Sequence, residues 1–261
     1  MRCLLSICAL CASLCLGALS FAGGDDSRSH SKRMAREDPA ETMTTATSAG
    51  IPVRVIRVNL ADPRVRISVQ VARGCPNGAE EFETMVARSK PVIAVNGAYF
   101  SKDSLKPIGD IVSSGRLVCK GMMGTAVAIT KDNDAAIRRV KWGHAEDWSD
   151  YETVIGCGPA LVLKGKVDVQ PENEGFHDPH VMGSTKRMGV GLTSDRQMLI
   201  VTTLEPVTFG RWAEVMRGLG CTDAMNLDAG ASLAMYYHGK TLIRPGRKLT
   251  NLLLVHVRAD E

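Results

Sequence analysis

Beyond residue 50 the chain is divided into short apolar segments that are separated by turn-forming residues. Residues 52–60 alternate apolar and basic side chains, which is typical of a β-strand with one face in solvent. The same alternation returns in residues 62–72 after an Asp-Pro turn, so we expect these two segments to form an antiparallel pair. The sequence contains 25 glycines and only 5% aromatic residues, which also favours a β-rich fold with many turns.

The rest of this region mixes strands with a few helices. Residues 92–95 form a continuous apolar run, as in a strand buried on both faces. Helices are predicted at residues 78–90, from the helical spacing of the apolar side chains, and at 210–220, which ends at a glycine. Further strands are predicted at residues 110–118, 124–130, 159–167, 187–203 and 252–257. We therefore predict the α+β class: a single domain, residues 51–258, with a mixed, largely antiparallel β core and a few flanking helices.

The N-terminus has the pattern of a secretory signal peptide. Arg2 precedes an apolar run, and small residues follow it up to Ala22. A transmembrane anchor is the alternative, but the run is short for one, so no stable membrane span is expected after cleavage of residues 1–22. Residues 23–50 mix charges with Ser, Thr and Ala and are predicted to be a disordered spacer. We expect an exported protein, periplasmic or secreted.

Export changes what the cysteines and the charge imply. Of the 8 cysteines, 4 lie in the predicted signal, which leaves Cys75, Cys119, Cys157 and Cys221. They allow two disulfides in three possible pairings, and buried free thiols are the alternative; both are favoured over a catalytic cysteine. The formal net charge of +4 is mild and no basic residues cluster, which argues against a nucleic-acid partner.

Two segments combine a buried strand, an asparagine and a turn of small residues. They read AVNGAYF, with Asn96, and MNLDAGAS, with Asn226 and Asp228. Small residues let a ligand approach backbone N–H groups, and side chains at strand ends commonly build binding sites. The alternative is a pair of ordinary turns. The occurrence of both segments in one chain, one with a carboxylate, indicates a candidate site.

Several basic residues lie beside the predicted long loop and before the last strand, where they could bind an anionic ligand. Arg187 lies between a long predicted loop, residues 170–186, and a glycine-flanked strand, and its guanidinium suits phosphate or carboxylate. Arg244 and Arg247 surround a Pro-Gly turn, and Asn251 leads into the last strand. A surface arginine and a solvated hairpin tip are the alternatives.

The long loop also contains His177, Asp178 and His180, which are metal-ligand types. Their spacing matches no strong metal signature, so we predict no metal and no cofactor. Ser232 lies in GASLA, which is not the GxSxG motif of a serine hydrolase.

Taken in order, the segments AVNGAYFS, PIGDIVSSGRL, VIGCGPALVLKGKV, STKRMGVGLTSDRQMLIVTT and AMNLDAGASLAMYYHGK resemble the phosphodiester glycosidase family. The family pattern of Asn-Leu-Asp, three glycines and serine is matched at Asn226, Asp228, Gly230 and Ser232. Ala229 and Ala231 replace the other two glycines, and Ala98 replaces a usual glycine after Asn96-Gly97. Each change adds a methyl group and disfavours positive φ, which implies a displaced substrate or a different specificity.

The resemblance implies hydrolysis of the bond between a sugar's anomeric carbon and a phosphodiester, in an N-acetylglucosamine-type or cell-envelope glycan substrate. It assigns Asp228 as base or nucleophile, Asp110 as a second carboxylate and Arg187 as phosphate binder. Further substrate-binding residues are Asn96, Gly97, Asn226, Gly230, Ser232, Arg244 and Asn251. Two alternatives stay open: a non-catalytic envelope protein that binds anionic glycans, and a phosphodiesterase that cuts the P–O bond with metals.

Overall fold

The computed structural model describes residues 39–259 except residues 122, 142 and 145. The predicted signal peptide, residues 1–22, and most of the predicted spacer lie outside the described residues. The spacer prediction is wrong at its C-terminal end, because residues within 23–50 form strand β1 (Glu41–Ser48). This strand pairs along its whole length with β2 (Ile51–Asn59), so the folded domain begins before the expected residue 51.

The strands form three sheets, and every strand pair among the described residues is antiparallel. The first sheet has the order β1, β2, β13 (Gln197–Val207), β12 (Thr185–Leu192), β14 (Asp223–Asn226), β10 (Ala160–Leu163) and β11 (Lys166–Val167). The second has the order β16 (Lys240–Ile243), β15 (Met235–Tyr237), β4 (Ile93–Asn96), β17 (Asn251–Val257) and β3 (Val65–Val71). The third has the order β6 (Arg116–Cys119), β5 (Ile111–Ser113), β9 (Thr153–Gly156), β7 (Thr125–Ile129) and β8 (Ala135–Arg139).

The predicted pairing of the first two alternating segments is wrong. Strand β2 lies between β1 and β13, whereas β3 pairs with β17 in the second sheet. The connection between them turns at Asp62, whose carboxylate accepts hydrogen bonds from the backbone and side chain of Arg64, and it carries the chain from one sheet to the other. Alternation identifies a strand but contains no information about its partner.

A shared core holds the three sheets together. The largest cluster of buried side chains includes Ile56 of the first sheet, Ile93 and Val95 of the second, and Val127 and Ile155 of the third. The inward faces of all three sheets therefore pack against one another, as layered β architectures require.

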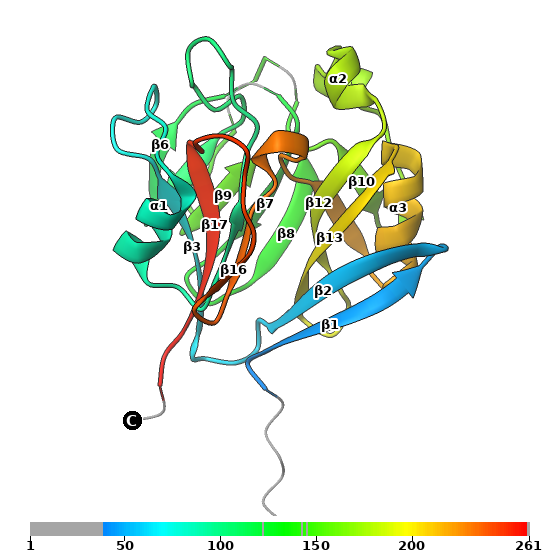
Figure 1. Cartoon of the computed structure of the whole chain (residues 1–261), viewed down its shortest axis with the longest axis horizontal. Helices are drawn as coiled ribbons and strands as arrows, with labels where there is room; N and C mark the ends of the chain where they lie inside the picture. The colour runs from blue at the N-terminus through cyan, green and yellow to red at the C-terminus, as the bar shows by residue number, and fades with distance from the viewer. Residues whose placement is uncertain (1–38, 122, 142, 145, 260–261) are drawn as a thin grey trace, which may run out of the picture. The chain divides into compact units, whose positions relative to one another are not determined.

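Two helices cover the outside of the sheets, and both were predicted. Helix α1 (Phe82–Ser89) packs Phe82 and Met85 against the second sheet, and α3 (Phe209–Gly218) packs Trp212 and Met216 against the first. Figure 1 shows α1 beside β17 and β3, and α3 beside β10 and β12. A third short helix, α2 (Pro179–Met182), lies within the predicted long loop. The α+β class with an antiparallel core is confirmed.

The four cysteines of the described residues are all free thiols, so the structure forms neither of the two expected disulfides. Cys119, Cys157 and Cys221 are buried, which corresponds to the alternative of buried thiols. No helix in the described part of the chain has the length and apolar character to cross a membrane.

Candidate functional site

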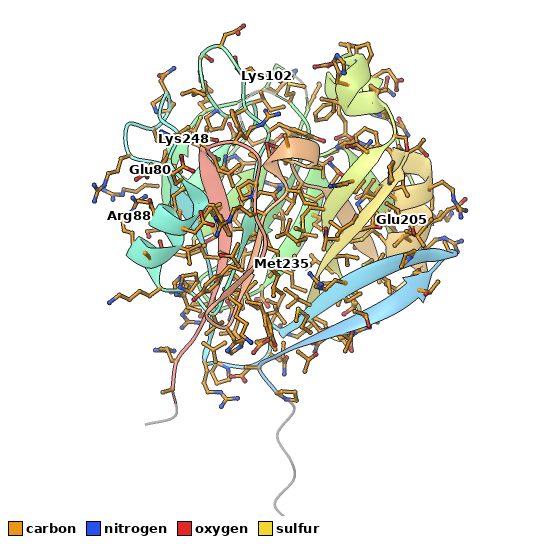
Figure 2. All side chains as sticks on the ribbon, viewed as in Figure 1. Glu80, Arg88, Lys102, Glu205, Met235 and Lys248 are labelled. Atoms are coloured by element: carbon orange, nitrogen blue, oxygen red, sulfur yellow. The ribbon has the colours of Figure 1, made fainter. Side chains whose placement is uncertain are left out.

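The site is a cavity of about 840 Å³ beyond the ends of β4, β12 and β14. Its walls come mainly from residues 99–103, 175–187 and 228–231, together with Arg247. Residues 175–185 belong to the predicted long loop, so the loop contributes one whole wall. Lys102, on the rim, lies at the same end of the sheets as α2 (Figures 1 and 2). Segments far apart in sequence therefore meet around one hollow, as in most ligand-binding sites.

The base of the long loop is anchored by a buried carboxylate. Glu174 is fully buried and accepts hydrogen bonds from Thr125 Oγ1 at 2.7 Å and Ala160 N at 3.0 Å. Arg139 Nε pairs with the same carboxylate at 2.9 Å. Because every partner belongs to a strand or a strand end, this wall of the cavity is tied to the sheets.

Asp228 lies two residues after the end of β14 and lines the cavity. Only 8% of the residue is exposed, and its Oδ1 accepts a hydrogen bond from Ala229 N at 2.7 Å. Burial raises the pKa of this carboxyl to about 6, against the opposing effects of the Ser232 hydroxyl, Ala229 N–H and the charge of Arg247. The Ser232 hydroxyl faces the carboxylate without full hydrogen-bond geometry. Asp228 therefore changes its protonation near neutral pH, where general bases and nucleophiles are useful.

Two buried asparagines hold the backbone around Asp228. Asn96 Nδ2 donates to the Asp228 carbonyl, and its Oδ1 accepts from Ala234 N at 2.9 Å. Asn251 Oδ1 accepts from Ala98 N at 2.6 Å. Neither asparagine is among the cavity-lining residues, so both position the turn rather than reach the ligand space.

Gly97 is required at the centre of this arrangement. Its carbonyl accepts from Asp228 N at 2.9 Å, which joins the end of β4 to the end of β14. A Cβ at this position would lie 2.1 Å from Asn251 Oδ1, far inside contact distance. Gly97 therefore allows the two strand ends to approach. The sequence instead predicted that it would let a ligand approach the backbone, but Gly97 is not among the cavity-lining residues.

Arg187 is fully buried at the start of β12, and its guanidinium stacks 3.9 Å from the centre of the Phe209 ring. It donates to the carbonyls of Val207 and Val181, both at 3.2 Å, and of Gly183. Burial lowers its pKa, but an arginine stays protonated in proteins. Within the described residues no carboxylate forms an ion pair with Arg187. The cavity wall thus contains a buried cation that has no carboxylate counter-ion among the residues that the structure describes.

Asn226 is fully buried behind the cavity and reaches it through Tyr99. Asn226 Nδ2 donates to the Tyr99 hydroxyl at 2.8 Å and to the Leu227 carbonyl. Tyr99 lines the cavity and was not selected from the sequence. Tyr99 lies three residues after Asn96 in the AVNGAYF segment. Its place in this candidate segment was the sequence signal that could have identified it.

Two predicted site residues lie elsewhere. Asp110 is buried away from the cavity, and its oxygens accept from Gly121 N at 2.8 Å and Trp148 Nε1 at 2.7 Å. Arg244 is exposed and pairs with Glu83 at 3.1 Å. Arg247, in the same loop between β16 and β17, lines the cavity instead. Asp110 braces a loop and the Arg244 side chain is exposed, so neither residue lines the candidate site.

The turn after Asp228 accommodates its alanines without backbone strain. Gly230 has a positive φ of 60°, whereas Ala229 is extended with φ −152°, and Ala231 is not among the residues with positive φ. Gly230 begins the 3₁₀ turn Gly230–Ser232. The expected conflict with positive φ is therefore absent at both alanines. Their effect is to add methyl groups to the cavity wall, which both residues line.

His177, Asp178 and His180 also line the cavity, and Asp178 caps α2 by accepting from His180 N at 2.8 Å. In the part of the chain that the structure describes, no group of three His, Cys, Asp or Glu side chains could hold a metal ion.

Known proteins resemble this chain both in sequence, over residues 89–256, and in fold. The family model described as phosphodiester glycosidase matches residues 89–256. The catalytic domain of zebrafish N-acetylglucosamine-1-phosphodiester α-N-acetylglucosaminidase, auto-inhibited by its pro-peptide, is similar with a TM-score of 0.66 and 20% identity, covering 85% of each chain.

Two further solved structures share the fold. A hypothetical protein from Synechocystis has a TM-score of 0.65 and 14% identity over 84% of this chain. The match covers 62% of that protein, less than two thirds of its length. A putative exported protein from Burkholderia pseudomallei has a TM-score of 0.56 and 15% identity, covering 78% of this chain and 74% of that one. No curated protein sequence matches.

Proposed function

Because the chain belongs to the phosphodiester glycosidase family, we propose that it hydrolyses the bond between the anomeric carbon of a sugar and a phosphodiester. Family and fold support a hydrolase of this kind. The substrate class follows from the name of the zebrafish relative and is an N-acetylglucosamine-type sugar-1-phosphodiester, either free or within a cell-envelope glycan. The protein acts after export, as the N-terminal pattern predicts.

The observation that carries this proposal is the pair of charges in one cavity. Arg187 is a buried cation without a carboxylate partner among the described residues, and Asp228 is a buried carboxyl with a pKa of about 6. A phosphodiester supplies the anion for Arg187, and its sugar places an anomeric carbon near Asp228. A cavity of about 840 Å³ has room for both parts of such a substrate.

The chemistry makes few demands on a general acid, because the departing phosphate is already a stable anion. Arg187 and Arg247 hold this phosphate, and Asp228 acts at the anomeric carbon as the C–O bond breaks. In its ionised form Asp228 stabilises the oxocarbenium-like transition state, either as base for water or as nucleophile. The anomeric configuration of the first-formed sugar distinguishes these two roles.

The test is turnover of UDP-N-acetylglucosamine and a panel of sugar-1-phosphodiesters by the chain from Gly23, in water enriched in oxygen-18. Label in the free sugar is the expected result, because water attacks the anomeric carbon. Label in the phosphate would mean P–O cleavage and would overturn the roles of Asp228 and Arg187. Binding of the panel without turnover by the wild type would favour the glycan-binding alternative.

The matched variant is Asp228→Asn, for which we expect kcat/KM to fall by about 10³-fold or more. The control is Asp134→Asn, which changes a surface carboxylate that pairs with Arg196 at 2.7 Å and should leave kcat/KM unchanged.

The free energy of unfolding of Asp228→Asn should not fall at pH 7.5. The raised folded-state pKa means that the contribution of Asp228 to stability is present below about pH 4 and is lost as pH rises through about 6. A pKa shift from 3.8 to about 6 corresponds to a cost of about 3 kcal/mol for keeping Asp228 ionised in the folded state. The neutral amide of the variant does not carry this cost at pH 7.5.

A further inference from the structure

Tyr99 lines the same cavity as Arg187 and Asp228. Its ring packs edge-on against Phe176, with centroids 5.8 Å apart, and both rings line the cavity. Its hydroxyl oxygen accepts the hydrogen bond from Asn226 Nδ2 at 2.8 Å. Asp228 and Arg187 both lie near enough to affect the phenol electrostatically.

The direction of the Asn226 bond follows from its second partner. The same Nδ2 also donates to the Leu227 carbonyl, an atom that can only accept. The amide therefore turns its nitrogen, not its oxygen, toward Tyr99. Asn226 Oδ1 is left buried with no hydrogen-bond partner among the described residues.

A phenol that accepts from Asn226 still has one hydrogen to donate. Arg187, the other group that interacts with this oxygen, carries only N–H donors. No acceptor in the described residues is paired with the Tyr99 hydroxyl. Burial, reinforced by Cys157 and Asp228, raises the pKa of Tyr99 well above its ordinary value, so the phenol remains protonated at physiological pH. The hydrogen is left for whatever occupies the cavity.

We propose that Tyr99 is a catalytic hydrogen-bond donor to the oxygen that joins the sugar to phosphorus. This inference rests on the proposed function. As the bond between the anomeric carbon and this oxygen breaks, the electron pair stays on the oxygen and the developing charge is stabilised by the Tyr99 O–H. The proton remains on Tyr99 and the phosphate leaves as an anion. Water supplies the new hydroxyl of the sugar, and its other proton passes to Asp228 or to solvent. A preorganised donor of this kind acts chiefly on the transition state.

The variant that tests it is Tyr99→Phe, which keeps the ring contact with Phe176 and removes only the hydroxyl. We expect kcat to fall roughly 100-fold while KM changes less than about threefold. Tyr151→Phe is the matched control, because Tyr151 lies outside the cavity, against Trp148 and Arg138. Its kcat should equal that of the wild type, and the melting temperatures of both variants should match it.

Varying the leaving group distinguishes a catalytic role of Tyr99 from a purely structural one. Across sugar-1-phosphodiesters whose leaving phosphates differ in basicity, the loss in Tyr99→Phe should be largest for the most basic leaving group. A loss that is equal for all leaving groups, or an unchanged kcat, would overturn the proposal.

Isothermal titration calorimetry with inorganic phosphate measures binding and does not need turnover. The wild type should bind phosphate and Tyr99→Phe should bind it about tenfold more weakly. This titration tests whether Tyr99 donates to a phosphate oxygen, and it does so separately from whether the wild type turns over a sugar phosphodiester. Equal affinity of the two proteins, or no binding by the wild type, would then refute the donor role.

Discussion

At the scale of single residues, the site depends on how burial and charge act together on one carboxyl. Burial raises the pKa of Asp228 to about 6, and the charge of Arg247 works in the opposite direction. Arg247 is half-buried in the loop between β16 and β17, which contacts the turn after Asp228 where Gly246 N donates to the Ala231 carbonyl at 2.8 Å. The ionised state of Asp228 that the proposed function requires therefore depends on a residue from a different part of the chain.

Replacing Arg247 by Met should move the acid limb of the kcat/KM profile to higher pH. Without the nearby positive charge the ionised form of Asp228 is less favoured, so its pKa rises by about half a pH unit or more. Lys248→Met is the control, because Lys248 is exposed and pairs only at 3.9 Å with the exposed Glu81. The measurement is a pH–rate profile of all three proteins. A shift of the acid limb to lower pH, or the same shift in the Lys248 variant, would contradict this account of Asp228.

At the scale of elements, the site is built where three strands end together. The end of β4 contacts the turn after β14 through Asn96 and Gly97, and the start of β17 contributes Asn251. The two asparagine side chains bond mainly to backbone atoms, and Asn251 also donates to Thr250 Oγ1. They therefore determine where Asp228 lies rather than what it binds, a common division of labour around active sites.

Replacing Gly97 by Ala should destabilise the protein by about 2 kcal/mol and reduce activity, because the new Cβ would lie 2.1 Å from Asn251 Oδ1. Gly210→Ala is the matched control. Gly210 lies in α3 with no atom within 4 Å of the added Cβ, so this variant should be as stable as the wild type or more stable. Urea unfolding of both variants checks the difference. Equal midpoints would show that the contact at Gly97 relaxes without penalty.

At the scale of the whole domain, β1 joins two of the sheets. It pairs with β2 along its length, and Glu41 at its start contacts His238 Nε2, beside β15, at 2.6 Å. Ser48 at its end donates to the Val215 carbonyl of α3 at 2.9 Å in a buried position. The strand therefore covers the edge of β2, which would otherwise present unpaired backbone groups.

A chain that begins at Ile51 should melt about 5–10 °C below one that begins at Asp38. The shorter chain lacks β1, so the edge of β2 becomes free to pair with another copy. Thermal melts and size-exclusion chromatography of the two proteins measure the loss of stability and any association. Identical melts would mean that β1 adds nothing to the stability of the sheets.

Much of the element structure was predictable because it depends on neighbours in the sequence. Alternation in residues 52–60, the unbroken apolar run at 92–95 and the helical spacing at 78–90 each correspond to an element of the predicted type. The edge strand β1 was missed because its sequence, ETMTTATS, is rich in Thr and lacks the apolar contrast of a strand with one buried face. Strands β8 and β9 were missed as well, being short and surrounded by polar loops.

By itself, the sequence determined that a carboxylate and small residues follow a buried strand, because strand ends and glycine turns are local properties. It placed Asp228, Asn226 and Arg187 in one candidate site, and the structure gathers all three around one cavity. The tertiary fold decides that Arg247 rather than Arg244 lines this cavity, and that Asp110 uses its carboxylate to brace the loop at Gly121 instead of lining the cavity. Packing between segments far apart in the chain determines which side chains of a loop face inward and which strands become neighbours. The local sequence of apolar and polar residues does not determine either.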